Sequence, residues 1–178
     1  KKIKNELGSP ILFIKNKGVG VHRAITTGFE AAEAEAVLVF PADEAYNTHI
    51  IDEMYKKFTE GSHVVVASRF MKGGSMSGGP VIKSLVVRIA SFLLRWLVRV
   101  PASDASYVLR LFSKKILDTV EIESTLGFTY AVELLVKCHR LGWPISEVPA
   151  LWQKRAKGAS RFNFKKWLPH YAKWFFYA

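Results

Sequence analysis

The sequence has little that could support a disulfide, a zinc site or a membrane-spanning helix. Its 178 residues include one cysteine, Cys138, so no internal disulfide can form and a reducing compartment is expected. The five histidines lack the spacing of a zinc site. Four cations interrupt the apolar stretch at 81–100, which argues against a membrane span. Internal repeats, linkers and low-complexity segments are also missing, so we expect one domain with a substantial core.

Acidic residues are missing from two long stretches of the chain. Residues 61–103 and 148–178 contain no Asp or Glu, and they carry six and seven Lys or Arg residues, together more than the net charge of +11. Both stretches are rich in Trp, Phe and Leu, which argues against an ordinary solvated basic face. These blocks predict an anionic partner: phosphates, nucleic acid or acidic lipid.

Hydrophobic spacing predicts strands that alternate with helices. Helices are expected from residue 21, from residue 51, over 81–100 and over 128–140. Strands are expected at 11–14, 36–40, 63–68, 107–112 and 144–149. This order predicts an α/β fold with a mostly parallel sheet flanked by helices, and ligands bind beyond the carboxyl ends of such strands. Two loops lie there, at 41–47 and at 69–80, and the second is rich in glycine and expected to be mobile.

The helix expected over 81–100 carries a narrow cationic stripe. One sector of its helical wheel contains Ser84, Arg88, Ser91, Arg95 and Arg99. Outside that sector every residue is apolar except Lys83. Such a helix suits either a membrane surface or a buried position that presents one arginine edge to a site. The aromatic and basic tail at 166–178 predicts a second membrane-proximal segment.

Two sets of residues near strand ends could meet a phosphate or a metal. Asp43 and Glu44 follow the strand at 36–40, where carboxylates can bind a divalent cation, although acids also follow strands as turn formers. Gly18 and Gly20 lie between a strand and a helix, where backbone N–H groups can bind an anion. A single G-x-G is weak evidence, and helix entry is its simpler interpretation.

Three arginines form the third candidate set: Arg69 after the strand at 63–68, Arg88 on the striped helix, and Arg155. A guanidinium group binds phosphate through two N–H groups and stays charged. Cations fixed near a diphosphate leaving group stabilise the charge that develops as a sugar departs. Each arginine taken alone is more often structural than functional.

The order and spacing of these pieces resemble the family 2 glycosyltransferases of the GT-A fold, especially the branch of dolichyl-phosphate mannose synthases. Eight family motifs have counterparts in the right order over about residues 11–165. The N-terminal four counterparts are Asn16–Gly20 for N-x-G-x-G, Pro41–Asp43 for D-x-D after a strand, Ala67–Phe70 for G-S-R-[FY] and Lys83–Arg99 for a cationic helix. The other four are Asp104–Phe112 for D-x-[ST]-x-G-[FY]-R-[LA]-[FY], Gly127–Leu134 for G-[FY]-x₄-E-L, Gly142–Pro149 for G-x-x-I-x-E-V-P and Arg155–Ser160 for R-x-x-G-x-S.

The resemblance implies that a sugar is transferred from a UDP- or GDP-linked donor to a polyprenyl phosphate or a related membrane acceptor, with inversion and with Mg²⁺ or Mn²⁺. It implies a partial GT-A domain at 1–165, a membrane-proximal segment at 166–178, and a peripheral location at the cytoplasmic face of the membrane, in the synthesis of cell-envelope glycans. Asp43 and Glu44 would bind the metal. The implied phosphate contacts are Arg69, Arg88 and Arg155, with Gly18, Gly20, Lys83 and Ser160 as further candidates. An acceptor phosphate is already ionised, so no strong general base is needed.

Three departures from the family pattern limit this expectation. Pro41 replaces the first acid of D-x-D, and Val108 and Leu109 replace the usual Gly-Phe. The family's first strand and its base-binding acids would lie upstream of Lys1. We therefore interpret the chain as a fragment that is inactive alone and has exposed sheet edges.

Two other classes of function remain open at this point. The net charge permits a basic nucleic-acid-binding module, but the bases lie among aliphatic residues and no nucleic-acid-binding motif is present, so we expect no nucleic-acid partner. A non-catalytic, membrane-associated relative of the transferases is also compatible with Pro41. It would bind liposomes without turning over a donor.

Overall fold

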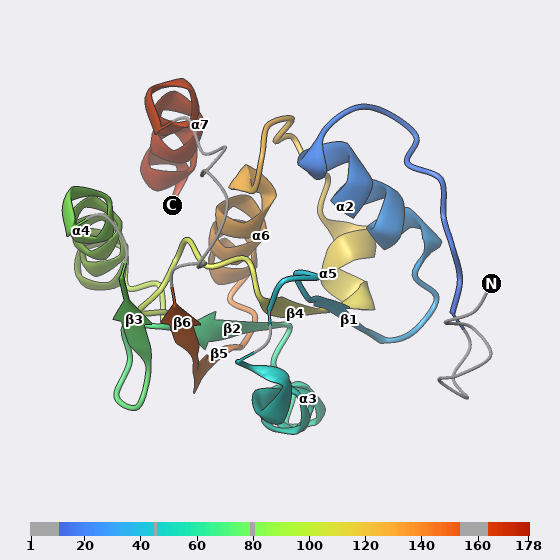
Figure 1. The fold of residues 1–178 in the computed structure, drawn as a ribbon, viewed down its shortest axis with the longest axis horizontal. Helices are drawn as coiled ribbons and strands as arrows, with labels where there is room; N and C mark the ends of the chain where they lie inside the picture. Colours follow the sequence, from blue (N-terminus) through green and yellow to red (C-terminus); the bar gives the residue numbers. More distant parts are fainter. Residues whose placement is uncertain (1–10, 45, 79–80, 154–163) are drawn as a thin grey trace.

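The computed structural model describes residues 11–44, 46–78, 81–153 and 164–178, and the side chains of 81–83 and 164–167 lie outside that description. In chain order the elements are α2 (Val21–Ala31), β1 (Ala36–Val39), η1 (Thr48–Ile50), α3 (Ile51–Thr59), β2 (Val64–Ser68), β3 (Ser75–Ser77), α4 (Val81–Leu97), β4 (Arg110–Ser113), α5 (Lys114–Thr119), α6 (Thr129–Arg140), β5 (Ile145–Pro149), β6 (Leu151–Gln153) and α7 (Phe164–Tyr177). Their arrangement is drawn in Figure 1.

The described strands form a central sheet in the order β1-β4-β2-β5 and a small second sheet of β3 and β6. β4 pairs antiparallel with both β1 and β2, whereas β2 and β5 are parallel. β1, β2 and β5 therefore run in one direction, as expected of a mostly parallel sheet, and β4 is reversed between them. Because of this reversal, β4 begins at the edge where the other three strands end.

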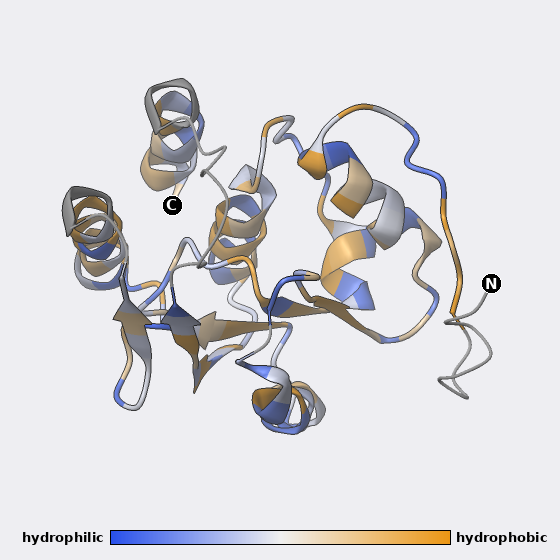
Figure 2. Ribbon diagram, viewed as in Figure 1, coloured by the Kyte–Doolittle hydropathy of each residue, from blue (hydrophilic) through white to orange (hydrophobic). Residues whose placement is uncertain are grey.

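Alternate residues of β2 pack on opposite faces of the sheet. Val64 and Val66 belong to a large core with α2, α5 and α6, whereas Val65 and Ala67 pack toward α3. Figure 1 shows α3 on one side of the sheet and these three helices on the other, and Figure 2 shows that the strands between them are apolar. Helix α6 is buried from Thr129 to Cys138, so the α/β layering expected from the sequence is confirmed.

The strand expected at residues 11–14 is wrong. These residues form no regular structure, and Leu12 and Phe13 are 75% and 71% exposed. The segment runs outside α2 (Figure 1). A strand needs a neighbour for its backbone N–H and C=O groups. β1 is an edge strand of the described sheet and pairs there with β4 alone, so residues 11–14 do not pair with it. The apolar pattern is therefore present without a partner strand.

The glycine-rich loop at 69–80 contains a strand that the sequence did not predict. β3 pairs in parallel with β6, and Ser75 N donates to Ala150 O at 2.9 Å. This small sheet ties the loop after β2 to the chain after β5. Two expected elements also have different bounds: β4 begins at Arg110, and α4 ends at Leu97 because Arg99 adopts a left-handed conformation with φ of 62°.

Candidate functional site

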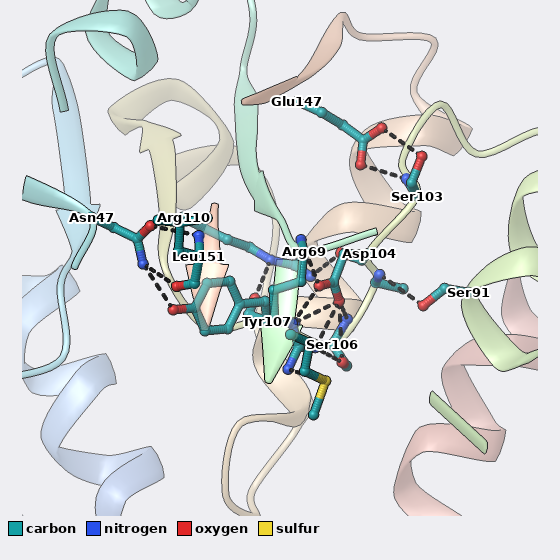
Figure 3. Close-up of polar contacts among 12 residues, drawn as sticks. Asn47, Arg69, Ser91, Ser103, Asp104, Ser106, Tyr107, Arg110, Glu147 and Leu151 are labelled. Atoms are coloured by element: carbon teal, nitrogen blue, oxygen red, sulfur yellow. Dashed lines mark hydrogen bonds and ion pairs between the residues drawn. The ribbon is translucent and has the colours of Figure 1, made fainter. Parts of the chain in front are cut away.

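The loops that follow β1, β2 and β5 meet the segment before β4 at one edge of the sheet. Figure 3 shows Asn47, Arg69, Tyr107 and Leu151, one from each of these four segments, joined through a network of polar contacts. Three of the segments follow strands that run in the same direction, and the fourth joins them because β4 is reversed. This edge is where ligands bind in open α/β sheets.

Arg69 is held by Asp104 in a two-point ion pair. Nε donates to Asp104 Oδ2 at 2.6 Å, and Nη2 donates to Oδ1 at 3.0 Å and to Ser106 Oγ at 2.8 Å. The backbone N–H of Arg69 also donates to Asp104 Oδ2 at 3.2 Å. Arg69 is 8% exposed and Asp104 is fully buried, so the guanidinium group has a fixed orientation.

In this buried ion pair the positive charge of Arg69 compensates the negative charge of Asp104. Burial alone would raise the pKa of Asp104, but the adjacent Arg69 guanidinium and its hydrogen bonds hold that pKa below its ordinary value. A second buried arginine lies nearby: Arg110 donates to the carbonyl oxygens of Tyr107, Ala131 and Asp104. Burial lowers the pKa of Arg110 to about 10. Arg110 therefore supports the chain around Asp104 from inside the core.

Tyr107 connects Arg69 to the loop that follows β1. The Arg69 guanidinium carbon lies 4.7 Å from the centre of the Tyr107 ring, and the Tyr107 hydroxyl donates to Glu44 Oε2. Glu44 Oε1 accepts from the backbone N–H of Tyr46 at 3.3 Å. Burial, together with the hydrogen bond to Glu44, raises the pKa of Tyr107, so its hydroxyl remains a donor.

Asn47 connects the same loop to β6. Its Nδ2 donates to Leu151 O at 2.8 Å and to the Tyr107 hydroxyl at 3.2 Å, and its Oδ1 accepts from Leu151 N at 2.8 Å. Asn47 is fully buried. One amide side chain thus joins the chain after β1, the chain after β5 and the segment before β4 (Figure 3).

Arg88 approaches the site from α4 through Phe70. The guanidinium carbons of Arg88 and Arg69 lie 4.8 Å and 5.0 Å from the centre of the Phe70 ring. Arg88 is exposed, and it lines a small pocket with Phe70, Ser91, Phe92, Arg95 and Ser103. The structure therefore brings Glu44, Arg69 and Arg88 into one neighbourhood, with Tyr107 and Phe70 between them.

Asp43 and Glu44 lie in the turn that follows β1, in which Glu44 N donates to Pro41 O at 2.9 Å. Asp43 is exposed and Glu44 is partly buried. Among the described residues no group of three or more His, Cys, Asp or Glu side chains could hold a metal ion. Mg²⁺ often takes only one or two protein carboxylates and completes its shell with waters and substrate phosphates. The two carboxylates fit a site of that kind.

The remaining predicted residues fall outside this neighbourhood or outside the described structure. Gly20 caps the start of α2, and Gly18 lines a separate surface hollow between α2, α5 and residues 120–125. Neither Asp43 nor Arg69 lines that hollow. The side chain of Lys83 lies outside the described residues, as do Arg155 and Ser160.

No role was predicted for Asn47, Asp104 or Tyr107, although all three are central to the site. Asp104 and Tyr107 stand in the segment that matches the motif at 104–112, and this was the available signal. Asn47 had no such signal. Its partners Tyr107 and Leu151 are 60 and 104 residues away in the chain.

The sequence is similar to two proteins of known name. It is 26% identical over 153 residues to a dolichol-phosphate mannosyltransferase of Pyrococcus furiosus, covering 85% of this chain and 43% of that protein. It is 20% identical over 149 residues to a polyprenol monophosphomannose synthase of Mycolicibacterium smegmatis, covering 81% and 56%. The chain thus spans about half the length of these relatives.

A solved structure and a family profile complete the comparison. Glucosyl-3-phosphoglycerate synthase of Mycobacterium tuberculosis, crystallised with Mn²⁺, UDP and phosphoglyceric acid, superposes with a TM-score of 0.57 at 14% identity, covering 90% of this chain and 52% of the other. That likeness supports the GT-A fold. Residues 1–120, about two thirds of the chain, match the profile of glycosyl transferase family 2. The chain therefore belongs to glycosyl transferase family 2.

Proposed function

We propose that the protein transfers a sugar from a UDP- or GDP-linked donor to a polyprenyl phosphate. The names of the Pyrococcus and Mycolicibacterium relatives support the acceptor class. One structural observation carries the proposal: Glu44, from the loop after β1, and Arg69, from the loop after β2, both contact Tyr107 at the carboxyl edge of the sheet. Carboxylates and guanidinium groups at this edge suit a nucleoside diphosphate with its cation.

Asp43 and Glu44 would hold the divalent cation, Mg²⁺ or Mn²⁺. The Mn²⁺ and UDP named for the Mycobacterium tuberculosis structure support this assignment. When bound, the cation offsets negative charge on the donor diphosphate. The chain's own part is to fix the Glu44 carboxylate, which accepts hydrogen bonds at both of its oxygens.

Arg69 and Arg88 would stabilise the phosphates. Asp104 fixes the orientation of Arg69, and Arg69 Nη1 lies 3.8 Å from the Met76 sulfur, a weak acceptor that a phosphate oxygen could replace. Arg88 is exposed beside it. A cation fixed before the reaction stabilises the departing diphosphate without reorganising. An ionised acceptor oxygen needs no base, and its attack opposite the diphosphate would invert the anomeric carbon. On the resemblance alone, the further phosphate contacts are Gly18, Gly20, Lys83, Arg155 and Ser160.

Helix α4 supports a peripheral position on the membrane. Its outward face is an apolar ridge of Leu85, Ile89, Phe92 and Trp96, which are between 48% and 69% exposed. Exposed arginines at 88 and 95 lie along one flank of the ridge, and residues 61–103 contain no acid. No helix in the described part of the chain is long and apolar enough to cross a bilayer. An apolar ridge with a cationic flank suits the surface of an anionic leaflet, here the cytoplasmic face, with 166–178 as a second membrane-proximal segment.

The test is transfer of a radiolabelled sugar to a polyprenyl phosphate by the whole protein. Asp43→Asn should lower metal-dependent transfer by about 100-fold or more, because several kcal/mol of charge stabilisation would be lost. Asp52→Asn, on the exposed side of α3, is the matched control and should leave transfer unchanged. Transfer by Asp43→Asn at the rate of the control would remove Asp43 from the mechanism. Liposome binding without turnover of the sugar donor would instead favour a non-catalytic relative, which the replacement of the first D-x-D acid by Pro41 would fit.

A further inference from the structure

The side-chain amide of Asn47 has its orientation dictated by the backbone of another segment. Leu151 presents both a donor N–H and an acceptor C=O to it, at 2.8 Å each. An amide has a donor end and an acceptor end, so only one orientation satisfies both groups of Leu151. Asn47 is fully buried, and the opposite orientation would leave its own amide groups and the N–H and C=O of Leu151 without these hydrogen bonds.

The fixed amide in turn sets the direction of the Tyr107 hydroxyl. The Nδ2 group of Asn47 can only donate, so the Tyr107 oxygen, 3.2 Å away, must accept from it. The single proton of that hydroxyl is then available for Glu44 Oε2, its other partner. Leu151 thus fixes the amide through a donor and an acceptor, and from Asn47 the hydrogen bonds run in one direction, through Tyr107 to the Glu44 carboxylate.

Leu151 is itself anchored to the rest of the site. It opens β6, which pairs in parallel with β3 in the loop after β2. The preceding residue, Ala150, donates to Ser68 O at 2.9 Å and accepts from Ser75 N at 2.9 Å. The Asn47 amide is therefore oriented by a backbone segment that is itself hydrogen-bonded to β2 and β3, and not by a mobile side chain.

We propose that Asn47 is a positioning residue that orients the Glu44 carboxylate through Tyr107. Neither Asn47 nor the Tyr107 hydroxyl need touch a ligand for this role. The inference rests on the proposed function in one respect, because it assigns Glu44 to the cation site. It adds a specific dependence: the cation affinity of the Asp43–Glu44 turn is set by an amide in the loop and a backbone that is 104 residues away.

Mn²⁺ alone is the probe, titrated into the whole protein and followed by the electron paramagnetic resonance signal of the free ion. Asn47→Ala and Tyr107→Phe should each weaken Mn²⁺ binding by about 10-fold, the usual loss when a group that orients a metal ligand is removed. The double variant should bind no more weakly than either single variant, because the two groups act in series. Tyr107→Phe deletes one oxygen and keeps the ring against Arg69, so it tests the idea even if Asn47→Ala folds poorly.

Tyr46→Phe is the matched control, because it removes a hydroxyl from the same loop at a residue that is 49% exposed. It should bind Mn²⁺ like the wild type. Hydrogen exchange gives a readout that separates the two steps of the relay. The Leu151 amide should exchange faster in Asn47→Ala, which removes its acceptor, and at the wild-type rate in Tyr107→Phe.

Two outcomes would contradict these ideas, and they can be told apart. If Asn47→Ala speeds exchange at Leu151 and lowers the melting temperature but keeps wild-type Mn²⁺ affinity, Asn47 is purely structural and the positioning role is wrong. If the wild-type protein binds no Mn²⁺, the cation site of the proposed function fails, and this role fails with it.

Discussion

The Asp104 carboxylate accepts two hydrogen bonds from the Arg69 guanidinium group, from Nε to Oδ2 at 2.6 Å and from Nη2 to Oδ1 at 3.0 Å. The pair joins the residue after β2 to the segment before β4, two chain segments that meet only because β4 is reversed. A residue that fixes a buried arginine should affect the stability of the fold first. Charge pairing inside a protein is costly to break from one side, because the remaining charge stays buried.

Asp104→Asn should lower the free energy of unfolding by about 3–5 kcal/mol at pH 7, because it leaves the buried Arg69 charge unpaired. The folded-state pKa of Asp104 is below its ordinary value, so this stabilisation is present above about pH 4 and is lost as the pH falls through the lowered pKa. Urea unfolding at pH 7 and pH 3 measures the difference. The gap between wild type and variant should narrow in acid, and a gap that is the same at both pH values would contradict the assignment.

Two lysines beside Trp174 offer a matched comparison of burial. Lys137 donates to Glu133 at 2.8 Å and to Glu123 at 2.7 Å and is 10% exposed, whereas Lys173 donates to Glu123 at 2.8 Å and is 54% exposed. Glu133 is fully buried. Lys137→Met should cost about 3–5 kcal/mol of unfolding free energy because it leaves the Glu133 charge uncompensated. Lys173→Met should change it little, and equal losses in chemical denaturation would show that burial does not decide the effect.

The layering of the fold could be read from hydrophobic spacing, because each face of a strand or helix is decided locally. Val64 and Val66 differ from Val65 and Ala67 in the core that they join, as a two-sided buried strand requires. The same local evidence failed at residues 11–14, an apolar run that pairs with no strand in the part of the chain that the structure describes. It also failed at β3 and β6, whose three-residue strands are too short to show a period.

The site was predictable in part for a similar reason. Asp43 and Arg69 could be placed beyond strand ends from the sequence, because parallel strands end at one edge. The contributions of Asp104 and Tyr107 depend on the reversal of β4, which hydrophobic spacing does not encode. The role of Asn47 depends on β6, a strand that the sequence did not reveal. Long-range hydrogen bonds, in contrast to strand ends, leave no local pattern.

Gly74 should tolerate no side chain, because its position is set by the tight turn between β2 and β3. A Cβ atom at Gly74 would lie 2.4 Å from Ser68 O and 2.9 Å from the Arg69 carbonyl carbon, and these backbone atoms cannot move aside cheaply. Gly74→Ala should therefore lower the free energy of unfolding by about 1–3 kcal/mol. Gly28→Ala is the control: a Cβ there meets nothing within 4 Å, and alanine inside α2 should stabilise by about 0.4–1 kcal/mol. Thermal unfolding that ranks the two variants in the opposite order would contradict this account.

The apolar ridge on α4 should insert into an anionic bilayer, with its arginine flank near the headgroups. Trp96→Ser and Phe92→Ser each remove a large apolar side chain that is 69% or 56% exposed, and burying such a side chain contributes about 1.5–3 kcal/mol. Each variant should therefore bind vesicles of phosphatidylcholine and phosphatidylglycerol about 10-fold more weakly in a sedimentation assay. Tyr55→Ser, which removes a 54% exposed ring from α3, controls for a general loss of surface hydrophobicity. If all three variants lose the same vesicle affinity, the ridge has no special role. If the ridge variants alone lose affinity, α4 is the contact. Added salt should also weaken vesicle binding by the wild-type protein, because Arg88 and Arg95 lie beside the ridge.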